Sequence, residues 1–149
     1  MLKGRRHYGQ ADSEISYFMV SAAAQGIIVS YPTGAIAPPA LDDADNFARI
    51  PAAKSEQPLG LLLDAVVSRD LTKDHLNCHK RETNIGGKVE IARRGWFITD
   101  QITGADPSAG DKAYFDVGGL LTIETGSLQV GVFESDPDAD GFVRVHINI

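Results

Sequence analysis

A run of closely spaced acidic residues near the end of the chain matches the opening of a calcium-binding loop. Residues 136–141 read Asp-Pro-Asp-Ala-Asp-Gly. Calcium loops of this kind place carboxylate oxygens at alternate positions and a glycine at the sharp turn. The twelfth position, where the loop needs a bidentate Glu, falls on Ile147. We therefore expect an acidic hairpin turn here and no metal site.

A second cluster places two imidazoles and the single cysteine close together, as His75, Cys78 and His79. A zinc site usually takes four ligands as two separated pairs, and the remaining histidines, His7 and His146, are far away in the sequence. A thiol–imidazole pair for nucleophilic catalysis needs a geometry that such close neighbours do not easily adopt. We expect no metal, no cofactor and no catalytic residue, so the chain is not predicted to be an enzyme.

Two further motifs have a simpler interpretation as turns. Pro32-Thr33-Gly34 and Gly86-Gly87-Lys88 lack the G-x-x-x-x-G-K-[ST] pattern of a phosphate-binding loop. The pair Arg93-Arg94 precedes Trp96, which is compatible with a cation–aromatic surface patch. The alternative is a tight turn with solvated charges and Trp96 in the core, and we favour that second interpretation.

Composition narrows the class of protein. The chain has 149 residues, 43% of them hydrophobic and 23% charged, which suits one folded domain or two small halves that share a core. Its net charge of -6 argues against nucleic-acid binding, although Lys3, Arg5 and Arg6 form a small basic cluster. One cysteine excludes an intrachain disulfide. No apolar run reaches the roughly 18 residues of a membrane span, and no secretory signal is evident, so we expect a soluble protein made inside the cell.

Alternating apolar residues punctuated by Gly and Pro predict about ten short strands and no amphipathic helix. The fold class is therefore all-β, a small β-barrel or sandwich. Residues 1–13 are predicted to be an extended N-terminal arm, and residues 14–149 a β domain. Ser68–Asn84 is predicted to be a long charged loop, and Leu59–Val67 a buried strand, with a helix left open. The other predicted strands are Ile15–Val20, Gly26–Tyr31, Asn46–Ile50, Lys88–Ala92, Trp96–Thr99, Gly110–Asp116, Leu120–Glu124 and a terminal hairpin over Leu128–Ile147.

Three pairs of segments share a pattern, which suggests two tandem β units with halves at 14–103 and 104–149. Chance similarity among Gly- and Val-rich strands is the alternative. Gly60 and Gly131 hold the same place in one pair, where a glycine indicates a bulge or a close backbone approach. The pairs are Leu59–Asp64 with Val130–Ser135, Gly87–Ile91 with Gly141–Val145, and Phe47–Ile50 with Leu120–Ile123.

The last forty residues resemble the ending of small capsid decoration proteins of tailed bacteriophages, also called cement or head-stabilising proteins. The resemblance rests on the order of strand and turn residues, and the run Gly86–Trp96 is also similar to some members. It covers residues 85–149 better than the first half. The segments that carry it are Gly110–Asp116, Gly119–Thr122, Val130–Ser135 and Asp140–Ile147.

This resemblance implies a virion protein, made in the host cytoplasm, on the outer surface of a capsid of HK97-like major capsid proteins. It would bridge neighbouring capsomers as a dimer or trimer, without contacting nucleic acid or membrane. The irregular segments would contact the capsid, and the predicted contact residues are Leu2, Arg5, Arg6, Tyr8, Ile36, Pro38, Pro39 and Leu41. Two alternatives stay open. One is a head–tail joining or fibre-base protein, and the other a β-barrel ligand binder or enzyme with a pocket lined by Asp64, Glu82, Asp100 or His79.

Overall fold

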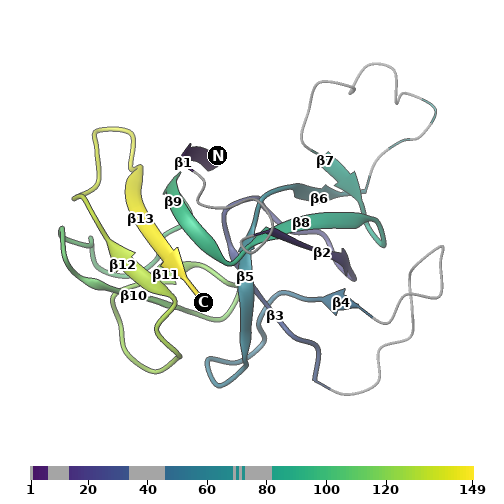
Figure 1. Cartoon of the computed structure of the whole chain (residues 1–149), viewed down its shortest axis with the longest axis horizontal. Coiled ribbons are helices and arrows are strands. Elements are labelled where there is room, and N and C mark those ends of the chain that lie inside the picture. The colour runs from purple at the N-terminus through teal and green to yellow at the C-terminus, as the bar shows by residue number, and fades with distance from the viewer. Residues whose placement is uncertain (1, 7–13, 34–45, 69, 71, 73–81) are drawn as a thin grey trace.

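The computed structural model describes residues 2–6, 14–33, 46–68, 70, 72 and 82–149. Within them the secondary structure consists of strands, so the prediction of an all-β fold is confirmed (Figure 1). The strands are β1 (Leu2–Arg6), β2 (Glu14–Met19), β3 (Ile28–Ser30), β4 (Phe47–Ala48), β5 (Pro58–Leu62), β6 (Ala65–Val67), β7 (Glu82–Asn84), β8 (Lys88–Ala92), β9 (Arg94–Thr99), β10 (Lys112–Phe115), β11 (Leu121–Thr122), β12 (Gly131–Phe133) and β13 (Val143–Asn148).

The first sheet has the strand order β3-β5-β8-β2-β4 and closes on itself. The pair β2–β4 is parallel, and the other pairs are antiparallel. The closing contact joins Ser30 of β3 to Arg49, the residue after β4, through backbone hydrogen bonds of 2.9 and 3.1 Å in both directions. Closure gives a small five-stranded barrel and removes most of the open sheet edges.

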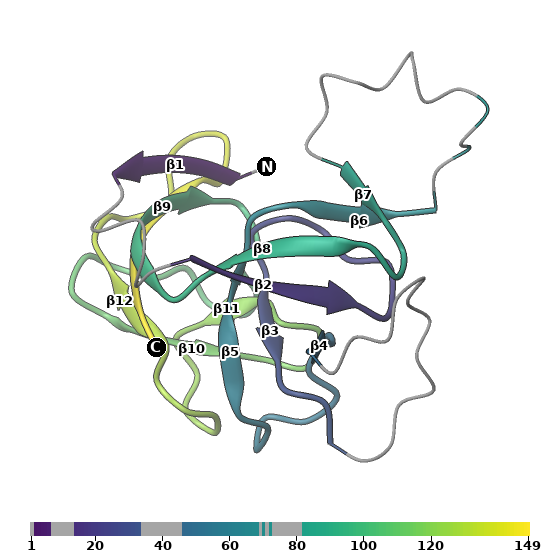
Figure 2. The ribbon, with the colours of Figure 1, turned by 45° about the vertical axis from the view of Figure 1, so that its right-hand side comes forward.

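The second sheet has the order β1-β9-β13-β12-β10-β11 and closes in the same way. Beyond the end of β9, the segment Gln101–Thr103 runs parallel to β11. The N–H of Leu121 donates to the carbonyl of Gln101 at 2.9 Å, and the N–H of Thr103 donates to the carbonyl of Leu121 at 2.8 Å. Strands β9 to β13 therefore form a second barrel, and β1 is added to its rim beside β9 (Figure 2).

The two barrels have the same connectivity. In chain order, β2, β3, β4, β5 and β8 pair with one another as β9, β10, β11, β12 and β13 do. In each barrel the first strand pairs with the last and runs parallel to the third. All three pairs of similar segments noted in the sequence fall on equivalent strands. The shared strand order divides the chain between β8 and β9, at Arg93, whereas the predicted halves were divided at residue 103. The repeated connectivity is consistent with two tandem β units.

Two glycines explain the sequence pattern in this repeat. A Cβ added at Gly60 of β5 would lie 2.6 Å from the carbonyl oxygen of Ala92, on the neighbouring strand β8. A Cβ at Gly131 of β12 would overlap the carbonyl oxygen of His146, on the neighbouring strand β13. The predicted close backbone approach is thus present at both equivalent positions, and a side chain at either would separate the strands.

Each barrel has its own core, and one face of the first barrel packs into the core of the second. The first core draws Met19, Val29, Ala48, Leu59 and Val89 from five different strands. The second core contains residues of β9 to β13, including Phe97, Phe115, Phe133, Val145 and Ile147.

The contact between the barrels comes from a row of residues on the outer face of the first barrel. Ile28, Leu61 and Ala92 lie opposite one another across β3, β5 and β8, and all three are fully buried in the core cluster of the second barrel. The turn after β10 adds a polar contact, in which the N–H of Ile28 donates to the carbonyl of Gly119 at 2.7 Å. The ammonium group of Lys54 lies 3.2 Å from the carboxylate of Asp116. The barrels are therefore held side by side by apolar packing and backbone hydrogen bonds.

Three local predictions need correction. The run Leu59–Val67 is two strands, β5 and β6, because the chain leaves the barrel sheet after Leu62 to pair β6 with β7. The helical alternative for this run was wrong. The long loop over Ser68–Asn84 ends in a strand, β7, and its central part lies outside the described residues. In the predicted N-terminal arm, residues 2–6 form β1, which pairs antiparallel with β9 of the same chain.

Candidate functional site

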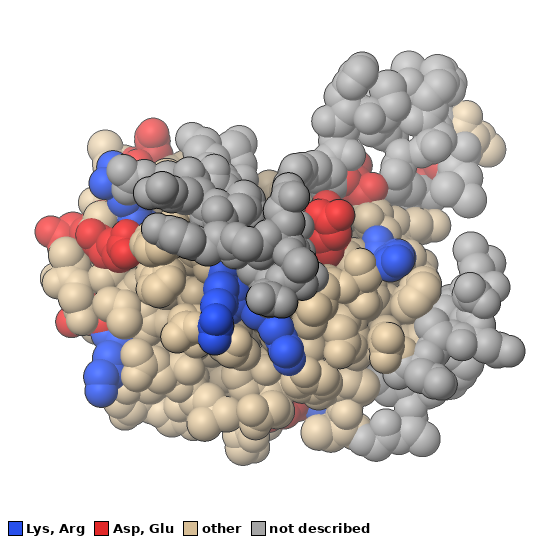
Figure 3. Space-filling model, in the orientation of Figure 1, with Lys and Arg blue, Asp and Glu red and all other residues tan. Residues whose placement is uncertain are grey.

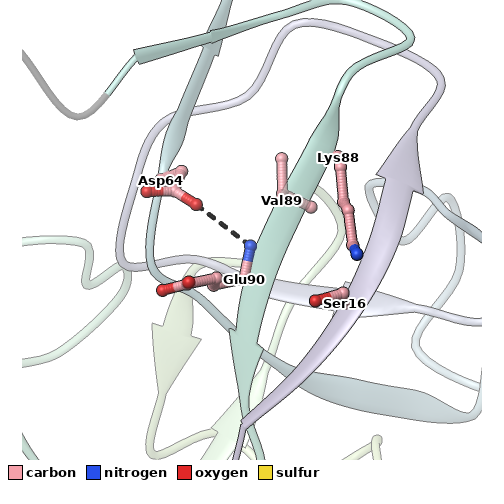
Figure 4. A pocket seen from close by; sticks show the side chains of 5 residues that line it. All are labelled: Ser16, Asp64, Lys88, Val89 and Glu90. Carbon is pink, nitrogen blue, oxygen red and sulfur yellow. Dashed lines mark hydrogen bonds between the residues drawn. The ribbon is translucent and has the colours of Figure 1, made fainter.

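One hollow lies on the outer face of the first barrel. It measures about 470 Å³ and is lined by Ser16, Asp64, Lys88, Val89 and Glu90. Ser16 and Glu90 face each other across β2 and β8. Asp64 follows β5, and its carboxylate accepts a hydrogen bond of 3.0 Å from the N–H of Glu90 (Figure 4). Figure 4 shows Lys88 extending along β8 towards Ser16, on the other side of the strand from Asp64.

The lining of this hollow can be compared with the residues predicted to line a ligand-binding or catalytic pocket. Of the residues predicted to line such a pocket, Asp64 does so, whereas Glu82 and Asp100 are absent from the lining and His79 lies outside the described residues. The lining contains neither histidine nor cysteine. Within the described residues, no group of three or more His, Cys, Asp or Glu side chains is placed to share a metal ion. The lining is therefore mainly polar, with Val89 as its one apolar residue.

The interpretation that places Trp96 in the core is wrong. Trp96 is half-buried on the outer face of the second barrel, where its ring stacks on His146 of β13 with centroids 4.6 Å apart. Its indole N–H donates to the carboxylate of Glu134 at 2.7 Å. Period-2 alternation along β9 turns Phe97 inward and Trp96 outward, so the alternation of this strand was the signal that could have placed both.

The neighbouring arginine pair divides between two environments. Arg94 is exposed at the start of β9, as expected for a solvated charge. Arg93 is half-buried, and its guanidinium donates to the hydroxyl of Tyr31 and to the carbonyl of Leu59. Arg93 therefore bridges strands β8 and β5 instead of extending into solvent, because the chain passes from one barrel to the other at this residue.

The Asp-rich turn is organised by hydrogen bonds within the chain. The carboxylate of Asp138 accepts from the N–H of Asp140 at 3.0 Å and of Phe142 at 2.8 Å. Asp136 accepts from the N–H of Ala109 at 3.1 Å, which ties the turn to the loop before β10. Gly141 has φ of 81° and allows the chain to reverse into β13. The acidic hairpin turn is thus present, with its first two aspartates engaged by backbone donors.

A buried polar network closes the first barrel, and nothing in the local sequence indicated it. Glu56, 8% exposed, accepts a hydrogen bond of 2.6 Å from the hydroxyl of the fully buried Ser30. The guanidinium of Arg49 pairs with the same carboxylate, and the N–H of Ala52 donates to it at 3.2 Å. Burial alone would raise the pKa of Glu56, but the hydrogen bonds from Ser30, Arg49 and Ala52 outweigh it and hold the pKa below its usual range.

This network predicts a loss of stability in acid. The pKa of Glu56 is lower in the folded protein than in the unfolded chain, so its ionised form stabilises the fold. This contribution to the free energy of unfolding is complete above about pH 4.3, the usual pKa of Glu, and is lost as pH falls through the folded pKa. We expect Glu56→Gln to lower the free energy of unfolding at pH 7 by about 1–3 kcal/mol, with a smaller difference from wild type in acid. Urea unfolding from pH 7 to pH 3 measures this. Glu124→Gln is the control, since Glu124 is exposed. A constant difference across this range would contradict the assignment.

The predicted capsid-contact residues fall into two groups. Leu2, Arg5 and Arg6 belong to β1, on the edge of the second barrel. Tyr8, Ile36, Pro38, Pro39 and Leu41 lie outside the described residues, as do His75, Cys78 and His79.

Among the residues that Figure 3 colours, acidic and basic side chains are interspersed over a largely uncharged surface. Single apolar side chains are exposed at Ile85, Val117 and Leu128. No helix in the described part of the chain is long and apolar enough to cross a lipid bilayer.

Comparison with solved structures shows where this fold recurs. The chain is similar to the head fiber gp8.5 N base of bacteriophage phi29, with a TM-score of 0.50 and 14% sequence identity. The likeness covers 99% of this chain and 95% of the other, so it includes both barrels. No protein-family model and no curated protein matches the sequence. At this identity the likeness establishes a shared fold, and the resemblance to decoration proteins stays a prediction.

Proposed function

We propose that this protein is a structural component of a phage head, acting as the base that anchors an appendage to the outside of the capsid. The observation that supports this proposal most strongly is the fold shared with the phi29 head fiber base over nearly the whole of both chains. A likeness confined to one small barrel would carry little weight, because small barrels host many functions. Here the match covers nearly the whole of both chains, and therefore both barrels of this one.

The surface chemistry is consistent with attachment by many modest contacts. The hollow beside β8 is mainly polar, and the exposed apolar side chains are scattered. A virion protein present in many copies needs no single strong site, because repeated weak contacts add up through avidity. We therefore propose a non-catalytic role, with the major capsid protein as partner.

A capsid decoration role is the second candidate. It is favoured by the order of strand and turn residues over Gly110–Ile147, which resembles decoration proteins. Symmetry and copy number separate the two roles. A decoration protein occupies local two-fold or three-fold axes over the whole shell, whereas an appendage base marks the sites of its appendage.

Charge reversal on β1 tests the attachment surface. We expect the double variant Arg5→Glu/Arg6→Glu to bind empty capsids of the source phage at least about tenfold more weakly, since the basic cluster of this acidic chain is lost from an edge strand. Lys112→Glu, an exposed site on β10 at the far side of the sheet, is the control. Co-sedimentation with capsids measures binding. Equal binding by both variants and wild type would exclude β1 from the contact surface.

A further inference from the structure

The shared connectivity of the barrels makes the edges of β2 and β9 comparable. In each barrel the first strand has the last strand on one side for its full length. On the other side, the third strand covers only the C-terminal end of β2 in the first barrel, and only the segment that follows β9 in the second. Counting from the equivalent pairs with β8 and β13, residues Glu14–Tyr17 of β2 correspond to Trp96–Thr99 of β9. Each first strand therefore leaves four residues of edge beyond the reach of its third strand.

On the second barrel this edge is covered by β1. Leu2, Lys3 and Gly4 pair antiparallel with Thr99, Ile98 and Phe97, and Arg6 lies opposite Trp96. On the first barrel, no strand of the described chain lies against Glu14–Tyr17 on the side away from β8. Figure 2 shows β2 at the front of the molecule, with β4 reaching only its C-terminal end.

The direction of the backbone groups can be derived from neighbouring hydrogen bonds. The N–H of Phe18 donates to the carbonyl of Asn46 at 2.9 Å, on the β4 side of β2. The N–H of Met19 donates to the carbonyl of Gly87 at 3.3 Å, on the β8 side. Because successive residues of a strand point their N–H and C=O groups to opposite sides, those of Ser16 point to the same side as those of Phe18. Ser16 thus presents a backbone donor and acceptor to the open edge.

We propose that this edge of β2 binds an extended, basic segment of a partner protein, which pairs antiparallel with Glu14–Tyr17 and completes the first barrel as β1 completes the second. Strand addition of this kind takes its affinity from main-chain hydrogen bonds and its specificity from flanking side chains. The edge segment itself has one charged residue, the acidic Glu14, which favours a basic strand. The strand on the equivalent edge of the second barrel carries Lys3, Arg5 and Arg6.

The partner is a separate protein because β1 of the same chain is already paired along β9. Moving β1 to β2 would expose one edge in order to cover another. The identity of that protein as a capsid subunit rests on the proposed function, whereas strand addition at β2 does not.

A synthetic peptide with the sequence of residues 1–8 is a suitable probe, since its central part is known to suit the equivalent edge. We expect this peptide to bind the wild-type protein, with amide shift changes centred on Glu14–Tyr17 in a nitrogen-15 NMR titration. Ser16→Pro removes the backbone donor and should weaken binding by about tenfold or more. Ser16→Ala keeps that donor and should bind like wild type.

A change in the probe keeps the test independent of protein folding. Lys3 lies opposite Ile98 on β9, and so corresponds to a residue opposite Ser16 on β2. A peptide N-methylated at this lysine should bind at least about tenfold more weakly, because it lacks the donor that faces the strand. Equal binding of both peptides, or equal binding by Ser16→Pro and Ser16→Ala, would overturn the proposal. Self-association of the protein that disappears on deletion of residues 1–6 would also overturn it, by assigning the edge to a second copy.

Capsid binding distinguishes this inference from the proposed function. If wild-type protein binds capsids but the peptide does not bind at β2, the inference fails while the proposed function stands. If the peptide binds as expected but capsids do not bind wild type, the proposed function fails and the strand-binding edge stands.

Discussion

Replacing Gly119 with alanine is expected to lower the free energy of unfolding by roughly 3 kcal/mol or more. Gly119 lies in the turn after β10 with φ of 80°, a region that costs an L-residue energy. An added Cβ would also overlap the carbonyl oxygen of Ile28, whose N–H donates to Gly119. The substitution therefore forces the turn away from β3 and breaks a hydrogen bond between the barrels. Urea unfolding followed by circular dichroism measures the loss.

The adjacent glycine provides a matched control for Gly119. Gly118 has φ of 93°, but a Cβ there meets nothing within 4 Å. We expect Gly118→Ala to cost about 1–2 kcal/mol, which is the effect of the backbone conformation alone. The difference between the two variants isolates the close approach of the barrels. Equal losses at Gly118 and Gly119 would show that the turn is not pressed against β3.

The second large effect is expected at Leu61, the middle of the row that joins the barrels. Leu61 is fully buried, and it lies between Ile28 and Ala92 in the core cluster of the second barrel. Leu61→Ala removes packing at a site whose neighbours belong to two rigid barrels, so a cavity remains. We expect a loss of about 2–5 kcal/mol. Leu128→Ala is the control, because Leu128 is 48% exposed and should change stability by at most about 0.5 kcal/mol.

The same unfolding experiment tests whether the two barrels of the wild-type protein unfold as one unit. Trp96 reports on the second barrel, while circular dichroism reports on both. Because one core cluster includes residues of both barrels, we expect the two signals to show the same transition in wild type. A stability of Leu61→Ala equal to that of wild type would contradict the packing of the first barrel into the second core.

Several strands, such as β9 and β13, were predictable from sequence because their burial alternates. Val143, Val145 and Ile147 are buried while Arg144 and Asn148 are exposed, so period 2 was enough to place the terminal hairpin. Gly60 and Gly131 were recognised as close approaches for a similar reason, since a glycine inside an apolar strand usually marks a bulge or a neighbouring backbone that comes close to it. Alternating burial and a glycine inside a strand depend on residues close together in the sequence, so the sequence pattern is enough to predict them.

Features that depend on distant residues were not predictable. The network of Ser30, Arg49 and Glu56 brings together a strand end, a bridge residue and a loop that show no common motif. The break after Leu62 was also hidden, because both β5 and β6 are apolar and the departure of the chain depends on pairing with β7. Each barrel is closed by one backbone bridge, and such a contact leaves no mark on the amino-acid composition.

The central proposal is that this protein is a structural component of a phage head, and it is tested most directly by the position of the protein on the phage particle to which we propose it belongs. Cryo-electron microscopy of purified particles, with and without this protein, gives that position and the copy number. We expect density for two adjacent barrels on the outer capsid surface at the foot of an appendage, lost together with that appendage in particles without the protein. If the protein is expressed during infection but purified particles show no density for it, the proposal is contradicted.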